Sequence, residues 1–307
     1  MNEALFSKKG KTLVQVATRL LMIEEGERIP KVESFSTELH VGRGTIQSSI
    51  KLLEKEGAIG LHSRGHLGTF LVHKDVAKLH KFSGVADITA VMPLPYSKKY
   101  EGLATGFTTE FEGLGMRLNI AFMRGSKPRL EGVLDERYDF AIVSKAAAQE
   151  FQHEQKSTLS IDKQLGLHSY VSGHRVFFAN PENEVIHSGM RVGIDRKSAD
   201  QLLLVEAEVG DKEVEYVELN YMHLLKNLEA GVIDATVWNS DEVANSSIHS
   251  RPLTSETARQ RAKDISETVV VVQEENKVIQ YLLSLIENEQ LMAIQHQVER
   301  GEIIPRY

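Results

Sequence analysis

Side chains suited to contacting nucleic acid recur between residues 43 and 51. They are Arg43, Thr45, Gln47, Ser48 and Lys51. The uncharged hydrogen-bonding groups can reach base edges, and the two cations can bind phosphates. This mixture suits a nucleic-acid surface better than simple solvation, so the stretch predicts binding to double-stranded DNA.

A second set of polar side chains follows apolar segments further along the chain. These candidates for binding a small ligand are Tyr96, Ser97, Arg124, Ser126, Ser144, Ser198, Trp238 and Asn239. In open α/β sheets, ligands bind beyond the carboxyl ends of strands and against helix N-termini, whose free N–H groups attract anions. We therefore expect these side chains to line a cleft for a small polar or anionic metabolite.

Four of these candidates have a structural alternative. Arg124 directly follows an apolar strand and could clamp a carboxylate with two hydrogen bonds, or pair with a neighbouring acidic residue. Ser97 and Ser198 could each begin a helix that receives an anion, or act as an ordinary N-cap. Trp238, the only tryptophan, could stack on a ligand or pack in the core.

Motifs for catalysis and for cofactors are missing. The sequence has no cysteine, which excludes disulfides and thiolate metal sites. It has no His-Glu-x-x-His, no Gly-x-x-x-x-Gly-Lys-Ser/Thr and no Gly-x-Ser-x-Gly, and its 12 histidines are scattered singly. We therefore predict that the protein is not an enzyme and has no catalytic residue, resident metal or cofactor.

An amphipathic helix must present the DNA-contacting side chains. Ile46, Ile50 and Leu53 mark one side at helical spacing, so the polar residues lie on the other side. Upstream, Ser34 is a plausible N-cap for a short helix that ends at a tight turn at residues 41–42. Two short helices joined by a turn that contains glycine predict a helix-turn-helix.

A hairpin follows this helix-turn-helix. Residues 58–62 and 68–72 read as two strands, and the loop between them has Gly65 at its tip. A hairpin in this position is a wing.

This order of pieces resembles the GntR class of bacterial winged-helix regulators, whose pattern runs LPS, VSRxTVRxAL, LxxEG and GxGTFV. The matching segments are residues 29–31, 41–47, 53–57 and 65–70. The resemblance implies DNA binding through helix and wing, and we expect Arg64 and His66 of the wing to reach the backbone or the minor groove. Gln47 stands where the family usually has arginine, so a side chain suited to adenine replaces one suited to guanine.

From residue 88 onward, short apolar runs alternate with amphipathic stretches. This pattern predicts an α/β fold with mostly parallel strands. The segment 157–178 separates two strand-helix series, and a strand followed by one long helix at 276–297 ends the chain. That order resembles the two-lobed type 2 periplasmic-binding-protein fold, which many bacterial regulators use as a ligand sensor. The local likenesses are residues 130–143 and 228–235, where a helix is followed by a reversal and then by an aspartate that enters a strand.

The whole chain, a GntR-like head on such a body, resembles the YhfZ family of bacterial proteins. We assign residues 1–76 to a winged helix-turn-helix domain, 77–87 to a linker with a short helix, and 88–307 to a two-lobed α/β domain. Within that domain, lobe one comprises 88–178 and 266–307, and lobe two comprises 179–265.

Charge is distributed unevenly between the two ends. Residues 1–80 contain 12 Lys and Arg against 9 Asp and Glu, whereas the remainder contains 24 against 34. A mildly basic head on an acidic body fits a protein that contacts phosphate with one end. No apolar run approaches the roughly 20 residues of a membrane span, and we expect a cytoplasmic protein that does not bind membranes.

These observations predict a ligand-responsive transcription regulator that acts as a homodimer, because operators are commonly read by two-fold dimers. Its small-molecule effector is not specified by the sequence. The alternative is a small-molecule-binding or enzymatic α/β protein whose winged helix no longer binds DNA. Gln47 in place of arginine keeps that alternative open.

Overall fold

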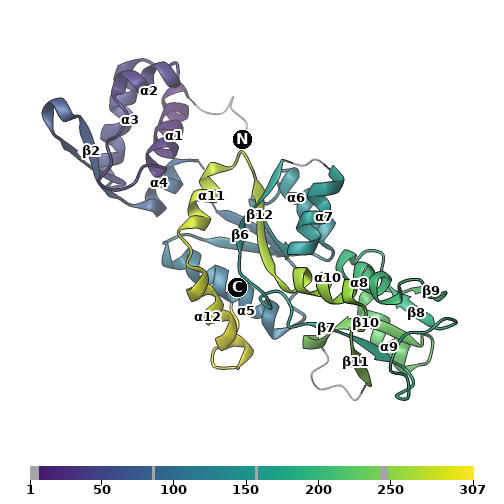
Figure 1. The fold of residues 1–307 in the computed structure, drawn as a ribbon. Helices are drawn as coiled ribbons and strands as arrows, with labels where there is room; N and C mark the ends of the chain where they lie inside the picture. The colour runs from purple at the N-terminus through teal and green to yellow at the C-terminus, as the bar shows by residue number, and fades with distance from the viewer. Residues whose placement is uncertain (1–6, 85–86, 156–157, 243–247) are drawn as a thin grey trace. The chain divides into compact units, whose positions relative to one another are not determined.

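The computed structural model describes residues 7–84, 87–155, 158–242 and 248–307, and the chain divides into two compact units (Figure 1). The unit that we call the head comprises the described residues up to Ile88 together with Phe111–Arg117. The unit that we call the body comprises Thr89–Glu110 and the described residues from Leu118 to Tyr307.

The head is a helix-turn-helix with a wing. Its elements are α1 (Lys8–Leu21), α2 (Val32–Glu38), α3 (Arg43–Lys55), β1 (Ile59–Ser63), the 3-10 turn η2 (Gly65–Leu67), β2 (Thr69–Lys74) and α4 (Val76–Phe82). Strands β1 and β2 pair antiparallel and form the expected hairpin. Helix α4, which includes most of the described part of the expected linker, packs against α1.

One detail of the head differs from the expectation. Ser34 is not an N-cap, because the chain becomes helical at Val32, directly after the extended residue Lys31. Lys31 occupies the cap position without a side-chain capping bond. The serine therefore indicated that a helix begins nearby, but it did not give the residue at which the helix begins.

The first body sheet has the strand order β4-β3-β5-β12-β6. Its strands are β3 (Ile88–Met92), β4 (Leu118–Phe122), β5 (Phe140–Ser144), β6 (Leu159–Gln164) and β12 (Thr268–Gln273). Strands β3 and β5 run parallel, but β12 lies antiparallel to both β5 and β6. The sheet is therefore mixed rather than mostly parallel, since the chain enters β12 from the opposite direction when it returns from the second lobe.

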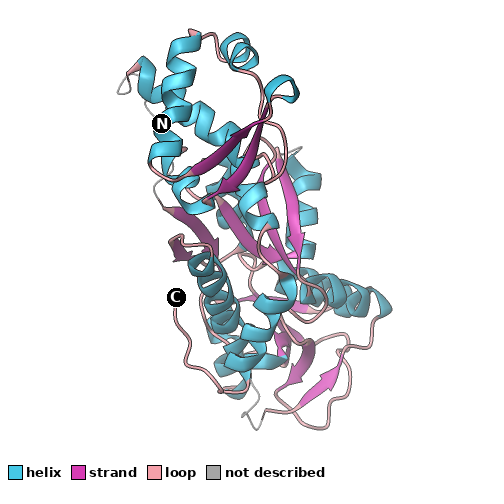
Figure 2. Cartoon of the chain, turned by 90° about the vertical axis from the view of Figure 1, so that its left-hand side faces the viewer, coloured by secondary structure: helices cyan, strands magenta, loops and turns pink. Residues whose placement is uncertain are grey.

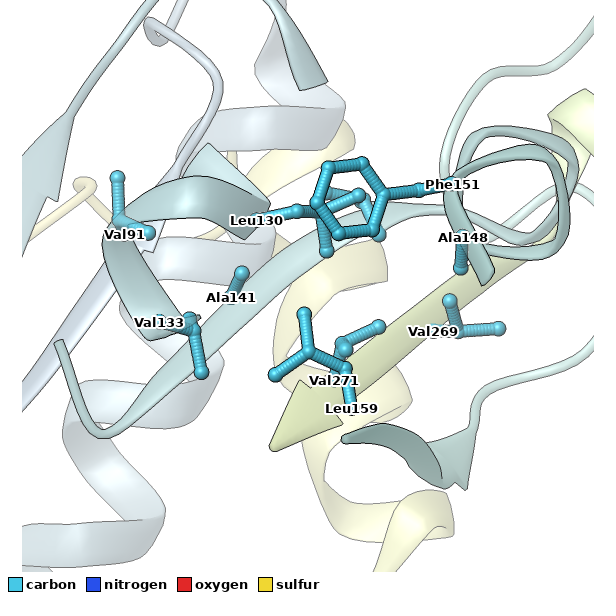
Figure 3. Packing of buried hydrophobic residues seen from close by; sticks show 10 residues of the cluster. Val91, Leu130, Val133, Ala141, Ala148, Phe151, Leu159, Val269 and Val271 are labelled. Carbon is cyan, nitrogen blue, oxygen red and sulfur yellow. The ribbon is translucent and has the colours of Figure 1, made fainter. Parts of the chain in front are cut away.

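Helices α5 (Lys98–Gly113), α6 (Ser126–Leu134) and α7 (Lys145–Gln155) accompany this sheet. Leu130 and Val133 of α6 and Phe151 of α7 pack with Val271 of β12 in the buried core (Figure 3). These side chains are at most 4% exposed, which fixes the start of α6 relative to the ends of the strands.

The second body sheet has the strand order β11-β7-β10-β8-β9. Its elements are β7 (His174–Phe178), β8 (Arg191–Ile194), α8 (Ala199–Val209), β9 (Glu215–Glu218), η3 (Tyr221–His223), α9 (Leu224–Glu229), β10 (Ala235–Asn239) and β11 (Ser250–Pro252). Strand β8 is parallel to β9 and β10, whereas β7 is antiparallel to β10 and β11. Strand β7 thus belongs to this sheet, although our division by sequence placed its residues in lobe one. A strand pattern shows that a segment is extended but not which sheet it joins.

The chain then returns through α10 (Glu256–Ser266) to β12 and ends with α11 (Lys277–Ser284) and α12 (Asn288–Glu299) (Figure 1). The single long helix expected at 276–297 is therefore two helices, because Glu287 is extended and starts the second one. Helices lie against both body sheets (Figure 2), with α6 and α7 on β5 and β12 of the first sheet and α8 and α9 on β8 and β10 of the second. Helix α12 lies against α5, where a Cβ atom on Gly102 would come within 2.9 Å of Gln295.

Candidate functional site

The polar face of α3 is the candidate DNA-contacting surface. The helix buries Ile46, Ile50 and Leu53, and this packing turns the opposite side outward. On that side Arg43, Gln47, Ser48 and Lys51 are exposed, and Thr45 is half-buried. All five side chains chosen from the sequence are therefore carried by one helix.

Contacts within the head leave most of this face available. Arg43 lies 3.2 Å from the carboxylate of Glu33, and both side chains are more than half exposed, so this pair adds at most about 1 kcal/mol. The hydroxyl of Ser48 donates to the carbonyl of Gly44 at 2.8 Å, which commits its proton to the helix. Gln47 and Lys51 have no hydrogen bond or ion pair with other described residues. Their side chains can reach a partner without breaking a contact.

The wing carries the other two candidates. The guanidinium of Arg64 lies 4.5 Å from the centre of the Phe70 ring, so a cation–π contact holds it at the base of the loop. His66 is exposed in η2, between Gly65 and Gly68, whose positive φ values of 57° and 98° make the tight turn. Arg64 is thus held against Phe70 of β2, while His66 is exposed at the tip.

A cavity of about 100 Å³ in the body lies where residues of both lobes meet. Six of the eight ligand-binding candidates line it, and they are Tyr96, Arg124, Ser126, Ser198, Trp238 and Asn239. Ser97 and Ser144 do not line it. Ser97 is buried and its Oγ accepts from the N–H of Tyr100 at 3.3 Å, which is the ordinary capping role.

Arg124 makes the ion pair that was the alternative to clamping a ligand. Its Nη2 contacts Oδ2 of Asp195, a residue of the second lobe that is only 4% exposed. Asp195 also accepts from the backbone N–H groups of Tyr221 and Lys197, at 2.7 and 2.9 Å. This ion pair therefore joins the two lobes, with its acidic partner already held by the second lobe.

A second bond between the lobes involves the buried Ser144. Its Oγ donates to Oδ1 of Asp200 at 2.8 Å, and Asp200 lines the cavity. Burial raises the pKa of Asp200 to about 6, against the lowering effects of the Ser144 bond and of the nearby Arg129 charge. Ser144 thus supports the cavity by holding one of its acidic groups.

Arg129 is a cavity residue that the sequence reading missed. It is 4% exposed, its Nε donates to the carbonyl of Gly125 at 2.9 Å, and its Nη1 donates to the carbonyl of Ile142 at 2.5 Å. Two longer contacts, 3.3 and 3.4 Å, reach the hydroxyl of Tyr170. The detectable signal was an arginine at helical spacing among the buried positions of α6, where an apolar side chain is expected.

Aromatic rings form the other walls of the cavity. Trp238 and Tyr221 stack with centroids 3.8 Å apart, and Tyr100 and Tyr170 meet edge to face at 5.1 Å. The indole N–H of Trp238 has no hydrogen-bond partner among the residues that the structure describes, and Nδ1 of His174 has none either. Burial lowers the pKa of His174 to about 4, so this ring is neutral at pH 7.

The described residues hold neither a membrane-spanning helix nor a cluster of metal-ligating side chains. None of their helices is long and apolar enough to cross a membrane. Within the same ranges, no three His, Asp or Glu side chains come together as a group that could hold a metal ion.

Family models match both units. A model described as the YhfZ C-terminal domain matches residues 75–307, and one described as a helix-turn-helix domain matches residues 24–71. The chain is 32% identical to the protein YhfZ of Escherichia coli K12, over 100% of both sequences.

Solved structures resemble the body. The crystal structure of YhfZ from Shigella flexneri matches with a TM-score of 0.60 at 32% identity, covering 73% of this chain and 94% of that one. A lipoprotein of the YaeC family from Enterococcus faecalis matches with a TM-score of 0.50 at 14% identity, covering 73% of this chain and 100% of that one. Together these matches agree with a helix-turn-helix head followed by a two-lobed α/β body of the periplasmic-binding-protein type.

Proposed function

This chain belongs to the YhfZ family, and from that premise we propose that it is a ligand-responsive transcription regulator. Its head binds operator DNA in the manner of GntR-like winged helices, and its body senses a small polar or anionic metabolite. The protein acts in the cytoplasm, where its DNA partner is, and it does not act as an enzyme. The observation that carries this proposal is the pairing of an available polar face on α3 with a cavity between two lobes.

The head supports the DNA-binding half of the proposal. Gln47 and Lys51 lie on the exposed face of α3, one with the amide that matches adenine and the other with a charge for phosphate. Arg64 and His66 of the wing supply contacts beside the groove in which α3 lies.

The body supports the sensing half. The Arg124 to Asp195 pair and the Ser144 to Asp200 bond both run from one lobe to the other beside the cavity. A ligand that binds the closed lobes more tightly than the open lobes shifts the equilibrium between them. We propose that this shift reaches the DNA-binding heads of a homodimer through the segment around Val76–Phe82 and changes their spacing.

The competing proposal is an α/β binding protein or enzyme whose head has lost DNA binding. Gln47 favours it, because the GntR pattern usually has arginine at that position. The exposed polar face of α3 weighs against it, since a face with no DNA partner has no need of this mixture of groups.

Selection of bound sequences from random DNA separates the two proposals. A regulator yields an enriched palindrome, whereas a head without DNA binding yields no enrichment. On the selected operator, Gln47→Ala should change the preference at one base pair by about 1 to 3 kcal/mol. As the matched control on the same helix, Lys51→Ala should weaken all sequences alike and lower the salt slope by about one. Equal losses on operator and random DNA for Gln47→Ala would remove its role as a base reader.

A further inference from the structure

We propose that the cavity in the body takes a compact monocarboxylate, whose carboxylate group pairs with Arg129 and whose uncharged part lies against the aromatic walls. This inference rests on the proposed function only in treating that cavity as the sensor site. It assigns the anion to Arg129, a residue of α6, rather than to Arg124.

Arg129 is a buried cation that makes no ion pair with the described residues, although the charge of Asp200 lies near enough to interact with it at longer range. Every hydrogen bond of its guanidinium with described residues goes to a neutral acceptor, namely two backbone carbonyls and the hydroxyl of Tyr170. Within the described ranges, no carboxylate lies at ion-pair distance from it. A buried charge is normally paired, and an arginine presents donors in a planar fork that matches a carboxylate. The two contacts to Tyr170 are long, so a ligand oxygen can compete for the Nη donors.

The other cations of the cavity are less suited to hold the anion. Arg124 is engaged by Asp195, which is itself buried and held by two backbone N–H groups. Lys197 is exposed, so water screens its charge. Of these three cations, Arg129 alone is buried and makes no direct ion pair with a described carboxylate.

The acid on the cavity wall limits the charge of the ligand. Asp200 lines the same cavity as Arg129, and its carboxyl disfavours a second negative charge nearby. The Asp200 carboxylate repels a dianion such as hydrogen phosphate more strongly than it repels a monoanion. A carboxylate carries one charge and presents two oxygens to one guanidinium.

The size and the walls of the cavity limit the rest of the ligand. A volume of about 100 Å³ is smaller than the roughly 150 Å³ that holds a benzene molecule, so the ligand is small. The stacked rings of Trp238 and Tyr221 offer an uncharged surface. The indole N–H of Trp238 is buried and lacks a partner among the described residues, so it can donate to a ligand hydroxyl or carbonyl.

The test compares sodium propanoate with propanamide, which has the same shape without the charge, and with sodium phosphate. Binding to the full-length protein is followed by thermal shift and by the fluorescence of Trp238, the only tryptophan. We expect saturable binding of propanoate and little response to propanamide or phosphate. Arg129→Gln should weaken propanoate binding by about 10- to 150-fold, which is the loss expected for a hydrogen bond to a charged group. Lys197→Gln, which removes an exposed cation of the same cavity, should change it less than about twofold.

Arg129→Gln could also fail because the helix needs its bonds to Gly125 and Ile142. Arg129→Lys keeps the charge and should retain a preference for propanoate over propanamide if it folds. The contrast between these two compounds in the unaltered protein decides the matter without any variant. Equal responses to them, a stronger response to phosphate, or equal losses in the Arg129 and Lys197 variants would each overturn the proposal.

The DNA selection is run on the same preparation. If the protein binds propanoate through Arg129 but enriches no DNA sequence, this inference stands and the proposed regulatory function is refuted. A protein that enriches a palindrome but does not distinguish propanoate from propanamide keeps the DNA-binding head and refutes this inference.

Discussion

Replacing Asp200 by asparagine should stabilise the body at neutral pH and lose most of that advantage in acid. Asp200 has an ordinary pKa of 3.8 that burial raises to about 6 in the folded protein. A carboxyl whose pKa is raised on folding makes the folded state less stable once it ionises, so its contribution falls as the pH rises from about 4 to above 6. The amide of the Asp200→Asn variant would stay neutral throughout, and its oxygen could still accept from Ser144.

The magnitude follows from the two pKa values. At about 1.4 kcal/mol for each pH unit between them, ionised Asp200 costs the folded state about 3 kcal/mol near pH 7.5. Near pH 4.5 the folded state keeps Asp200 protonated, and the remaining cost is about 1 kcal/mol. Asp200→Asn should therefore gain about 3 kcal/mol near pH 7.5 and only about 1 kcal/mol near pH 4.5.

His174 changes the stability of the folded state in the opposite direction over the same pH range. Its pKa falls from 6.5 to about 4 on folding, so stability that is present above pH 6.5 is lost as the pH falls toward 4. This contribution is the same in the parent and in the Asp200→Asn variant, and it cancels when the two are compared at one pH. The combined contribution of Asp200 and His174 to stability therefore varies less with pH than the contribution of either group alone.

Urea unfolding followed by Trp238 fluorescence measures this effect, because the single tryptophan reports on the body. Asp211→Asn is the control, since Asp211 is exposed and its replacement should change stability by less than about 0.5 kcal/mol at any pH. An advantage of Asp200→Asn that stays constant between the two pH values would refute the reasoning, because it would not come from ionisation.

Two further predictions concern packing and assembly. Gly102→Ala would bring a Cβ within 2.9 Å of Gln295 on α12 and should lower the free energy of unfolding by about 1 to 3 kcal/mol. The control Gly113→Ala on the same helix meets nothing within 4 Å and should raise the free energy of unfolding by about 0.5 to 1 kcal/mol. A thermal melt that shows the same change for both variants would contradict the packing of α12 on α5. Light scattering at micromolar concentration should give the mass of a homodimer, about twice 34.4 kDa, and a monomer both with and without operator DNA would argue against the proposed assembly.

The head could be predicted almost completely from its sequence, because its signals are local. The apolar spacing of Ile46, Ile50 and Leu53 fixes which side of α3 is buried, and Gly65 marks the turn of the wing. The N-cap predicted at Ser34 lies at Lys31 instead. Capping residue types locate the end of a helix only to within a few residues.

The cavity could be predicted only in part. The rule that ligands bind at the carboxyl ends of strands in open sheets predicted that Tyr96, Arg124, Ser198 and Trp238 lie near one another. All four line the cavity. The partner of Arg124 could not be found, because Asp195 is 71 residues away and in the other lobe. Arg129 was missed for a different reason. It lies inside a helix rather than at a strand end. Its proposed role depends on its being buried, and the burial of an arginine cannot be predicted from its residue type.

Strand β12 imposes an order on the biosynthesis of this protein. In the first sheet, β6 is at the edge, and among the described strands it pairs with β12 alone. On a ribosome that adds about 5 to 20 residues per second, the stretch between Gln164 and Thr268 takes on the order of 5 to 20 s to translate. During that interval β5 and β6 each lack the strand that later lies between them, and their unpaired backbone groups are open to pairing with other chains. A release of the nascent chain anywhere in lobe two would leave a first lobe that cannot close its sheet, so we expect truncated products to aggregate or be degraded rather than persist as a working half.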